Sequence, residues 1–412
     1  MQARKIINDP VFGFINIPKG LLYDIVRHPL LQRLNRIKQL GLSSVVYPGA
    51  QHTRFQHSLG AFYLMSETIQ HLKAKGNFIF DSEAEAVKAA ILMHDIGHGP
   101  CSHVLEDTIV QGVCHEDISL MLMEYINKEM NGQLTLAIQI FKDEYPKRFL
   151  HQLVSGQLDM DRLDYLRRDS FYSGVTEGNI GSARIIKMLD VRDDHLVVES
   201  KGIYSIENFL MARRLMYWQV YLHKTSVAYE RMLISALLRA KELAEQGVEL
   251  FASPALHFFL YNNVQRGDFY NNPQCLENFI QLDDNDIWTA LKVWSNHTDK
   301  VLSTLSQGMI NRQVFKVETS TEPIEKARIE EIQTQISRQL GITFDEAAYF
   351  ISTPSIEKNM YNPADDSIDI LYGDETIKDI AEASDMLNIQ LLAKKVKKYY
   401  LCYHRLGVLQ AK

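Results

Sequence analysis

The chain has 412 residues, of which 46% are hydrophobic and 23% are charged, a balance typical of globular proteins with two or three domains. Its formal net charge of −7 gives no overall basic field, which argues against nucleic-acid and membrane-surface binding. The four cysteines are scattered without a CxxC pair, which favours a reducing compartment. Since no signal-peptide or membrane-spanning run is present, we expect a soluble cytoplasmic protein.

Apolar residues recur at helical spacing through most of the chain, which predicts a mainly α fold. The first such segment covers residues 30–40 and ends at Gly41. Further helical segments are predicted over 57–75, 83–96, 115–130 and 205–246. A small hairpin is predicted from residues 196–199 and 203–204.

The pattern changes after about residue 311. Short apolar or alternating runs, typical of strands, occur at 313–317, 348–351, 368–372 and 399–403. Helical segments are predicted between them at 322–340 and 384–397. We therefore predict two domains, a helical domain over residues 1–310 and a smaller C-terminal α+β lobe over 311–412.

The most informative residues are His94 and Asp95, which follow the apolar run 89–93. An imidazole beside a carboxylate on a buried helix is unfavourable, because a buried charge without a partner destabilises the fold. A divalent cation removes this penalty, since it binds neutral imidazole nitrogen and ionised carboxylate oxygen together. Three more histidines follow at positions 98, 103 and 115, and His98 shares a face with His94 if the helix extends that far.

Two other segments offer ligands of the same kind. His57 opens a predicted helix, and residues 159–165 alternate carboxylates with apolar residues. Taken alone, each has a structural explanation, as a helix-start residue or as a solvated helix face. Combined with His94 and Asp95, two histidines and two aspartates suit Mn, Fe, Zn, Ni or Mg with open water positions. Such an ion activates water and neutralises phosphate charge, so the set favours phosphoester hydrolysis.

The order His57, His94-Asp95, Asp161 resembles that of the HD-domain metal phosphohydrolases. The resemblance runs from about residue 5 to about 316 and continues more weakly through the C-terminal lobe. Segments similar to the deoxynucleoside triphosphate (dNTP) triphosphohydrolase branch of that family are Asn8-Asp9-Pro10, Gln32-Arg33-Leu34, Lys38-Gln39-Leu40-Gly41, Tyr47-Pro48-Gly49-Ala50, 52–60, 94–103 and 159–169.

The resemblance implies a metal core over about residues 50–170 and a role for each matching residue. The implied ligands of a divalent metal ion are His57, His94, Asp95 and Asp161. The implied catalytic residues are His98, His103, His115 and Glu116. Of these, His103 or His115 would transfer protons, and Glu116 would orient His115. The family reaction is attack of water on the α-phosphorus, which releases a deoxynucleoside and inorganic triphosphate.

The same resemblance implies a set of substrate-binding residues. They are Gln39, Leu40, Arg54, Arg162, Tyr165, Asp169, Arg213, Tyr221, His223 and Lys224. The four cationic residues among them would bind the triphosphate, since arginine binds phosphate bidentately. These four are Arg54, Arg162, Arg213 and Lys224. Tyr165 and Asp169 would contact the sugar 3′-hydroxyl, and Tyr221 would fill the space that a 2′-hydroxyl needs. Without the resemblance, the spacing over 213–224 describes an ordinary amphipathic helix.

Members of this branch form homo-oligomers with activator sites between subunits, so the resemblance implies a dimer, tetramer or hexamer. Relatives activated by guanine nucleotides carry an acid and an arginine where this chain has Arg27 and Asn35. The sequence is therefore equally consistent with a different nucleotide activator or with none.

Two alternative functions stay open: another HD phosphohydrolase acting on nucleoside monophosphates, cyclic nucleotides or alarmones, and a nucleotide-sensing scaffold. The four cations favour a triphosphate, and the intact ligand set argues against a scaffold.

Overall fold

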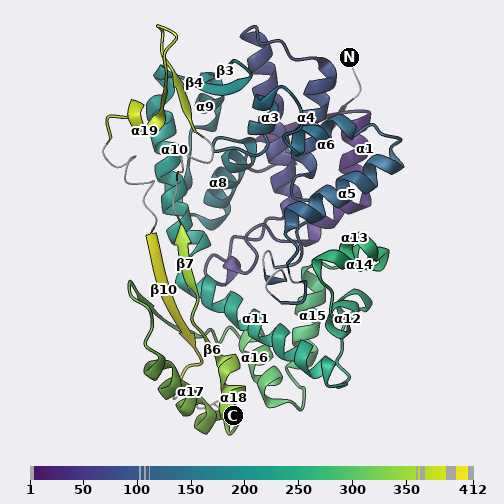
Figure 1. Cartoon of the computed structure of the whole chain (residues 1–412), viewed down its shortest axis with the longest axis vertical. Coiled ribbons are helices and arrows are strands. Elements are labelled where there is room, and N and C mark those ends of the chain that lie inside the picture. Colours follow the sequence, from purple (N-terminus) through teal and green to yellow (C-terminus); the bar gives the residue numbers. More distant parts are fainter. Residues whose placement is uncertain are drawn as a thin grey trace.

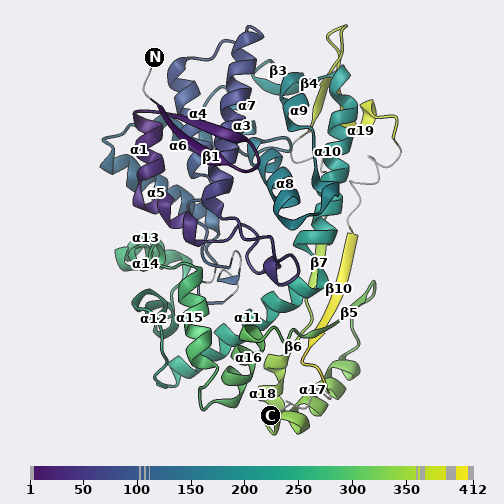
Figure 2. The ribbon, with the colours of Figure 1, turned by 180° about the vertical axis from the view of Figure 1, so that it is seen from behind.

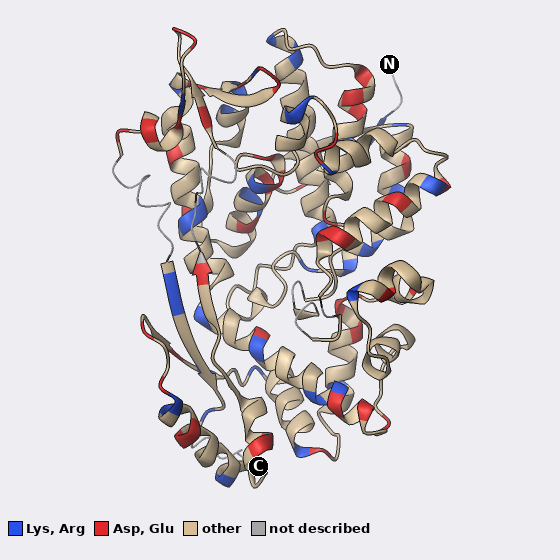
Figure 3. Cartoon of the chain, in the orientation of Figure 1, with Lys and Arg blue, Asp and Glu red and all other residues tan. Residues whose placement is uncertain are grey.

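The computed structural model describes residues 4–101, 104–105, 108–110, 112–358, 361, 367–386 and 396–406. The fold is mainly α, as predicted, and the described residues form three small sheets. Figures 1 and 2 show two bodies, which we call the upper and lower body. Charged residues of both signs are interspersed over both bodies (Figure 3). Within the described ranges, no helix combines the length and apolar character that a membrane crossing requires.

The first half of the chain builds the upper body. Its helices are α1 (Leu21–Arg27), α2 (Pro29–Arg33), α3 (Arg54–Ala74), α4 (Asp81–Met93), α5 (His115–Glu129), α6 (Thr135–Phe141), α7 (Arg148–Gln152), α8 (Met160–Ser173), α9 (Ser182–Met188) and α10 (Ile203–Met216). The helices of the lower body are α11 (Lys224–Glu245), α12 (Pro254–Tyr261), α13 (Arg266–Asn271), α14 (Pro273–Phe279), α15 (Asp284–Trp294), α16 (Lys300–Ile310), α17 (Lys326–Leu340) and α18 (Phe344–Ala347).

Of the three sheets, the first is local and the other two join segments that lie far apart in the sequence. The first is the antiparallel hairpin of β1 (Arg4–Asp9) and β2 (Gly13–Pro18). The second has the order β3 (Leu189–Arg192), β4 (His195–Glu199), β8 (Asp369–Leu371) and β9 (Ile377–Asp379), followed by α19 (Ile380–Ala383). In the third, β10 (Val396–Tyr403) pairs with β5 (Lys316–Ser320), β6 (Ile351–Ser352) and β7 (Ser355–Lys358). Because β4 and β8 pair, one sheet contains strands from both sides of residue 310. The division of the chain into two domains at that residue stays a prediction.

Several predicted elements differ from the structure. The strand at 196–199 is part of a hairpin, but its partner is β3, and residues 203–204 begin α10. The predicted helix over 205–246 is divided into α10 and α11 by a π-helical turn at Tyr217–Tyr221. The segment 348–350 is a 3₁₀ turn before β6. Most of the predicted helix at 384–397 lies outside the described residues, and residues 396–397 belong to β10.

The packing of α3 against α4 and α8 positions the site. A capping box of Thr53 and Gln56 begins α3, and Asp159 caps α8 by accepting a hydrogen bond from Arg162 N. The lower body contributes through Asp284 at the start of α15. Its carboxylate accepts hydrogen bonds from Lys38 N at 2.9 Å and Cys101 N at 3.0 Å, which connects two segments that flank the site.

Candidate active site

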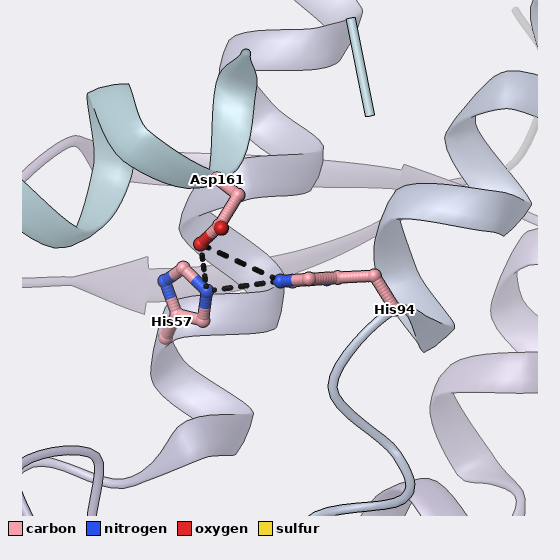
Figure 4. Close-up of side chains that lie close together, drawn as sticks. All are labelled: His57, His94 and Asp161. Carbon is pink, nitrogen blue, oxygen red and sulfur yellow. Dashed lines mark hydrogen bonds and ion pairs between the residues drawn. The ribbon is translucent and has the colours of Figure 1, made fainter. Parts of the chain in front are cut away.

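Three predicted metal ligands meet where α3, the end of α4 and the start of α8 come together (Figure 4). His57 lies near the N-terminus of α3, His94 caps α4, and Asp161 lies in the first turn of α8. His57 Nε2 is 3.2 Å from His94 Nε2 and 3.1 Å from Asp161 Oδ1. Ligand atoms held about 2.1 Å from one ion lie about 3.0–3.4 Å apart. Two of the three distances lie in this range, and the third, 3.6 Å between His94 Nε2 and Asp161 Oδ1, is slightly longer. The three atoms are therefore close enough together to share an ion.

The hydrogen bonds of the Nδ1 atoms of His94 and His57 determine which nitrogen of each ring carries the proton. His94 Nδ1 is 2.7 Å from the carbonyl oxygen of Ile91, which can only accept, so Nδ1 donates. His57 Nδ1 donates to Asp164 Oδ2 at 2.7 Å. In the neutral rings both Nε2 atoms are thus bare acceptors that face each other and a carboxylate oxygen. Such acceptors repel one another unless a cation lies between them, and a divalent metal ion fits this donor set.

The charges around His57 show the same preference for a cation. Burial lowers the pKa of His57, but hydrogen bonds with Asp161 and Asp164 outweigh burial and raise the pKa to about 10. Burial raises the pKa of Asp161, but hydrogen bonds with His57 and His94 hold that pKa far below its ordinary value. The carboxylates are therefore ionised and favour positive charge at this position. Without a metal ion, protonated His57 carries that charge, and a bound ion would take the place of its Nε2 proton.

Asp95, the fourth predicted ligand, faces the same position. Its Oδ1 lies 3.4 Å from His94 Nε2, and its Oδ2 lies 3.8 Å from His57 Nε2. Oδ2 also accepts a hydrogen bond of 2.6 Å from Arg54 Nη1. Because α4 ends at Met93, Asp95 lies beyond the helix, and its carboxylate is shared between the histidines and Arg54.

A cavity of about 300 Å³ opens beside these ligands. It is lined by His94, Asp95, His115, Glu116, Phe141, His151, Val154, Ser155, Asp159, Asp161 and Arg162. The structure thus brings His115 and Glu116 to the cluster. The His98 ring stacks on His115 with centroids 3.9 Å apart, and burial, helped by the charge of Arg54, holds the pKa of His98 well below its ordinary value. His103 lies outside the described residues.

The structure does not gather the four predicted phosphate-binding cations in this cavity. Within the described part of the chain, only Arg162 of the four lines it. Arg54 is 5% exposed and donates to Asp95. Arg213 donates to Gln157 Oε1 at 2.9 Å and is also buried.

His223 and Lys224 line a different cavity, of about 700 Å³. Its other lining residues are Trp218, Leu222, Thr319, Ser320, Thr321, Lys398 and Tyr400. The π-helical turn before α11 places both residues beside β5 and β10. Neither residue lines the cavity at the metal cluster.

The residues predicted to contact the sugar form one group. Tyr221 donates its hydroxyl proton to Asp169 Oδ2 at 2.8 Å, and the Tyr165 ring packs edge-on against Tyr221 with centroids 5.9 Å apart. Asp169 Oδ1 lies 2.7 Å from His52 Nε2, which donates to it. The Asp169 and His52 side chains are both buried, so they hold each other in a fixed orientation.

Gln39 and Leu40 lie on a segment that runs beside residues 52 and 53. Gln39 N donates to the carbonyl oxygen of His52 at 3.0 Å, and a β-bridge joins Lys38 to Thr53. Gln39 Oε1 is buried and makes no hydrogen bond with a described residue. The segment therefore lies next to the Asp169 group, although neither Gln39 nor Leu40 lines the 300 Å³ cavity.

Three residues at the site were not predicted from the sequence. Asp164 binds His57, and its position one helical turn after Asp161 is a signal that could have identified it. His52 orients Asp169, and His151 lines the metal cavity. The His151 Nδ1 donates to the carbonyl oxygen of Ile140 at 2.9 Å, which leaves Nε2 as an acceptor. Neither histidine has a spacing that distinguishes it from a packing residue.

Comparison with known proteins identifies the family. The HD domain model matches residues 54–168, and the HD associated region model matches residues 180–253. The uncharacterized protein YwfO of Bacillus subtilis is 30% identical over 397 residues, which cover 93% of this chain and 88% of that protein. Deoxynucleoside triphosphate triphosphohydrolase SAMHD1 of Homo sapiens is 29% identical over 289 residues, which cover 60% of this chain and 46% of that protein.

A solved structure agrees with the sequence matches. The crystal structure of a phosphohydrolase from Bacteroides thetaiotaomicron is 86% identical, has a TM-score of 0.96, and covers 98% of this chain and 100% of that chain. The HD domain match includes α3, α4 and α8, which carry the candidate ligands. HD domains are metal-dependent, and the cluster of His57, His94 and Asp161 is one that could hold a metal ion. The chain therefore belongs to the HD-domain phosphohydrolases.

Proposed function

We propose that this protein hydrolyses dNTPs to a deoxynucleoside and inorganic triphosphate. The observation that carries the proposal is the convergence of His57 Nε2, His94 Nε2 and a carboxylate oxygen of Asp161 beside a polar cavity. The similarity to the human protein named as a dNTP triphosphohydrolase supports this choice of substrate, although the chain spans 46% of that protein's length.

The proposed metal ligands are His57, His94, Asp95 and Asp161. A bound Mn, Mg, Fe, Ni or Zn ion would lower the pKa of a water molecule and neutralise phosphate charge. The chain's own contribution is to fix the ligands in place. Asp164 and the Ile91 carbonyl orient the two imidazoles, and Arg54 orients Asp95.

The remaining cavity residues bind the substrate or transfer protons to it. In the proposed reaction water attacks the α-phosphorus, the bond to the 5′ oxygen breaks, and that oxygen gains a proton. We assign the proton transfer to His115, whose ring is stacked on His98 and whose neighbour is Glu116. His103 remains the predicted alternative. Arg162 offers the phosphate a bidentate partner at the cavity wall.

In this proposal Asp169 and the residues that contact it bind the sugar. Each Asp169 oxygen has one hydrogen-bond partner among the described residues, so each has a lone pair for the sugar 3′-hydroxyl. Tyr165 and Tyr221 form the adjacent wall, and Gln39 with Leu40 forms the floor. Tyr221 would exclude a 2′-hydroxyl by filling its space.

A product assay tests the proposal directly. The purified protein, supplied with Mn or Mg, is incubated with each of the four dNTPs, with and without a second nucleotide, and the products are separated by chromatography. We expect deoxynucleoside and triphosphate in equal amounts, and neither from the His94→Ala variant. Monophosphate or pyrophosphate as the only products would exclude the proposal.

A nucleoside monophosphate is the second candidate substrate, and the placement of the cations favours it. A triphosphate needs several cations, yet Arg162 is the one predicted cation that lines the 300 Å³ cavity in the described structure. Arg54 and Arg213 would reach a triphosphate there only if their contacts with Asp95 and Gln157 changed, and Lys224 lines the other cavity. Release of inorganic phosphate from a deoxynucleoside monophosphate, with no triphosphate from any dNTP, would favour this candidate.

The proposal includes a homo-oligomer, with any nucleotide activator bound between subunits. Arg27 and Asn35 replace the residues that read guanine in activated relatives, so we expect an activator other than a guanine nucleotide, or none. Light scattering during size-exclusion chromatography, with and without each nucleotide, measures the number of subunits and its dependence on ligand.

A further inference from the structure

A continuous series of buried ion pairs connects the N-terminal hairpin to His57. It begins at Asp9, the last residue of β1, and passes through Arg168 and Asp164 of α8. Arg168 Nη1 donates to Asp9 Oδ2 at 2.7 Å. Arg168 Nε donates to Asp164 Oδ2 at 2.9 Å, and its Nη2 donates to Asp164 Oδ1 at 3.0 Å. Asp164 Oδ2 then accepts the 2.7 Å hydrogen bond from His57 Nδ1.

All four side chains are shielded from water. Those of Arg168, Asp164 and His57 are 0% exposed, and that of Asp9 is 3% exposed. Screening by solvent is weak at such positions, so each pair fixes the geometry of the next. A change at Asp9 is therefore transmitted to Asp164 rather than absorbed by water.

A glycine allows the series to lie against α3. A Cβ atom built on Gly60 would come within 1.9 Å of Asp164 Oδ1 and 2.1 Å of Arg168 Nη2. The ion pair therefore packs directly on the backbone of the helix that carries His57, one turn further along. This contact restricts Asp164 to the position from which it binds the imidazole.

Asp9 has a second function at the start of the series. Its Oδ1 accepts hydrogen bonds from Val11 N and Phe12 N, each at 2.9 Å, and so forms the turn between β1 and β2. β2 in turn packs against α3 (Figure 2). The carboxylate that shapes the hairpin is thus the same one that binds Arg168.

We propose that Asp164, Arg168 and Asp9 are positioning residues that hold His57 with Nε2 directed at the metal site, so that the N-terminal hairpin sets metal affinity. The inference rests on the proposed metal site. A carboxylate that binds the distal nitrogen of a metal-binding histidine fixes its tautomer and its ring orientation. In this protein the series gives the same role to Asp9, which lies 48 positions before the ligand His57.

The test is the affinity of the full-length, metal-free protein for Mn²⁺, measured by isothermal titration calorimetry. Asp164→Asn should weaken Mn²⁺ binding by about 10–100-fold, the range found for residues that orient metal ligands. Asp9→Asn keeps an oxygen for the two turn amides but removes the charge that binds Arg168. It should weaken binding by less than about 10-fold, the lower limit of that range, because Asp9 acts on His57 only through Arg168 and Asp164.

A matched control separates positioning from general stability. Glu83→Gln breaks another ion pair of the upper body, in which Glu83 is buried and Lys147, 2.8 Å away, is partly exposed. It should lower the melting temperature without changing Mn²⁺ affinity. If Asp9→Asn fails to fold, Asp9→Ser, which can still accept from a turn amide, replaces it.

The outcomes distinguish the inference from the proposed function. Mn²⁺ affinity within twofold of wild type in folded Asp164→Asn and Asp9→Asn proteins would overturn the positioning series. Failure of the wild-type protein to bind Mn²⁺ or any other divalent ion would instead overturn the metal site itself. A selective loss of affinity in the two variants, with Glu83→Gln unaffected, would support the series.

Discussion

Arg54 donates a hydrogen bond of 2.6 Å to Asp95, and both residues are buried beside the histidine cluster. The pair gives Arg54 a role different from the phosphate contact that the sequence implies. Its guanidinium balances the charge of one carboxylate of the proposed metal site, and it holds the Asp95 carboxylate just beyond the end of α4. Arg54 is thus better placed to orient a ligand than to bind the substrate.

Replacement of Asp95 should abolish both metal binding and hydrolysis. Asp95→Ala removes one carboxylate ligand and leaves the Arg54 guanidinium buried without its partner. Loss of one member of a buried ion pair lowers the free energy of unfolding by about 3–5 kcal/mol. Elemental analysis gives the metal content, and chemical denaturation gives the stability. Asp117→Ala, which removes a partly exposed carboxylate paired with Arg266, is the control, and full metal content in Asp95→Ala would contradict the assignment.

His115→Ala should separate metal binding from turnover. His115 lines the cavity but belongs to α5, and none of the four proposed ligands lies on that helix. The variant should retain the metal and lose about 10²–10⁴-fold in kcat, the range for removal of a general acid or base. Metal content and kcat are measured on the same preparation. An unchanged kcat would assign proton transfer to another group.

The metal cluster could be predicted because its ligands lie on strongly patterned helices. His57 and His94 lie on apolar helical segments, Asp161 lies where carboxylates alternate with apolar residues, and the order of the three in the chain is characteristic of one family. The positioning residues were harder to find. Asp9 lies on a short strand, and its contact with Arg168 joins residues 159 positions apart. Spacing along one helix cannot reveal such a contact.

The remaining differences arise where tertiary pairing overrides local pattern. The run at 196–199 is a strand, but its partner β3 follows α9 directly and is only four residues long, so the alternation of Leu, Asp, Val and Arg over 189–192 is too short to identify it. The regular apolar spacing through 205–246 conceals the π-helical turn at 217–221. His223 and Lys224, which follow this turn, line the cavity beside β5 and β10 and not the cavity beside His94 and Asp161.

Tyr221→Ala should relax the discrimination between deoxyribose and ribose. The Tyr221 ring packs beside Tyr165, and its hydroxyl donates to Asp169, so truncation opens space next to the proposed sugar position. We expect hydrolysis of ribonucleoside triphosphates to rise relative to dNTPs. Tyr221→Phe, the control, keeps the ring and removes one hydrogen bond, which is typically worth about 1 kcal/mol, or about fivefold in kcat/KM. Competition assays with paired nucleotides measure the ratio, and equal ratios in wild type and Tyr221→Ala would remove Tyr221 from the sugar site.

Glu83 should give the fold a component of stability that is lost in acid. Its side chain is 1% exposed and accepts hydrogen bonds from Lys147, Tyr145 and Phe80 N. Burial raises the pKa of Glu83, but the hydrogen bonds from Lys147 and Tyr145 outweigh it and hold the pKa below the ordinary value of 4.5. A carboxylate with a lowered pKa in the folded state stabilises that state above the unfolded pKa, and this stability disappears as the pH falls through the folded pKa.

The comparison of wild type with Glu83→Gln, both free of metal, isolates this contribution. At pH 7 the variant should be less stable by about 1.5–3 kcal/mol, the value of a hydrogen bond to a charged group. The difference should shrink as the pH falls below about 4.5, because the wild-type carboxylate then becomes protonated and loses its ion pair with Lys147. Thermal unfolding between pH 3 and pH 7, monitored by circular dichroism, measures this stability difference. A stability difference that stays constant or grows toward low pH would contradict the lowered pKa of Glu83.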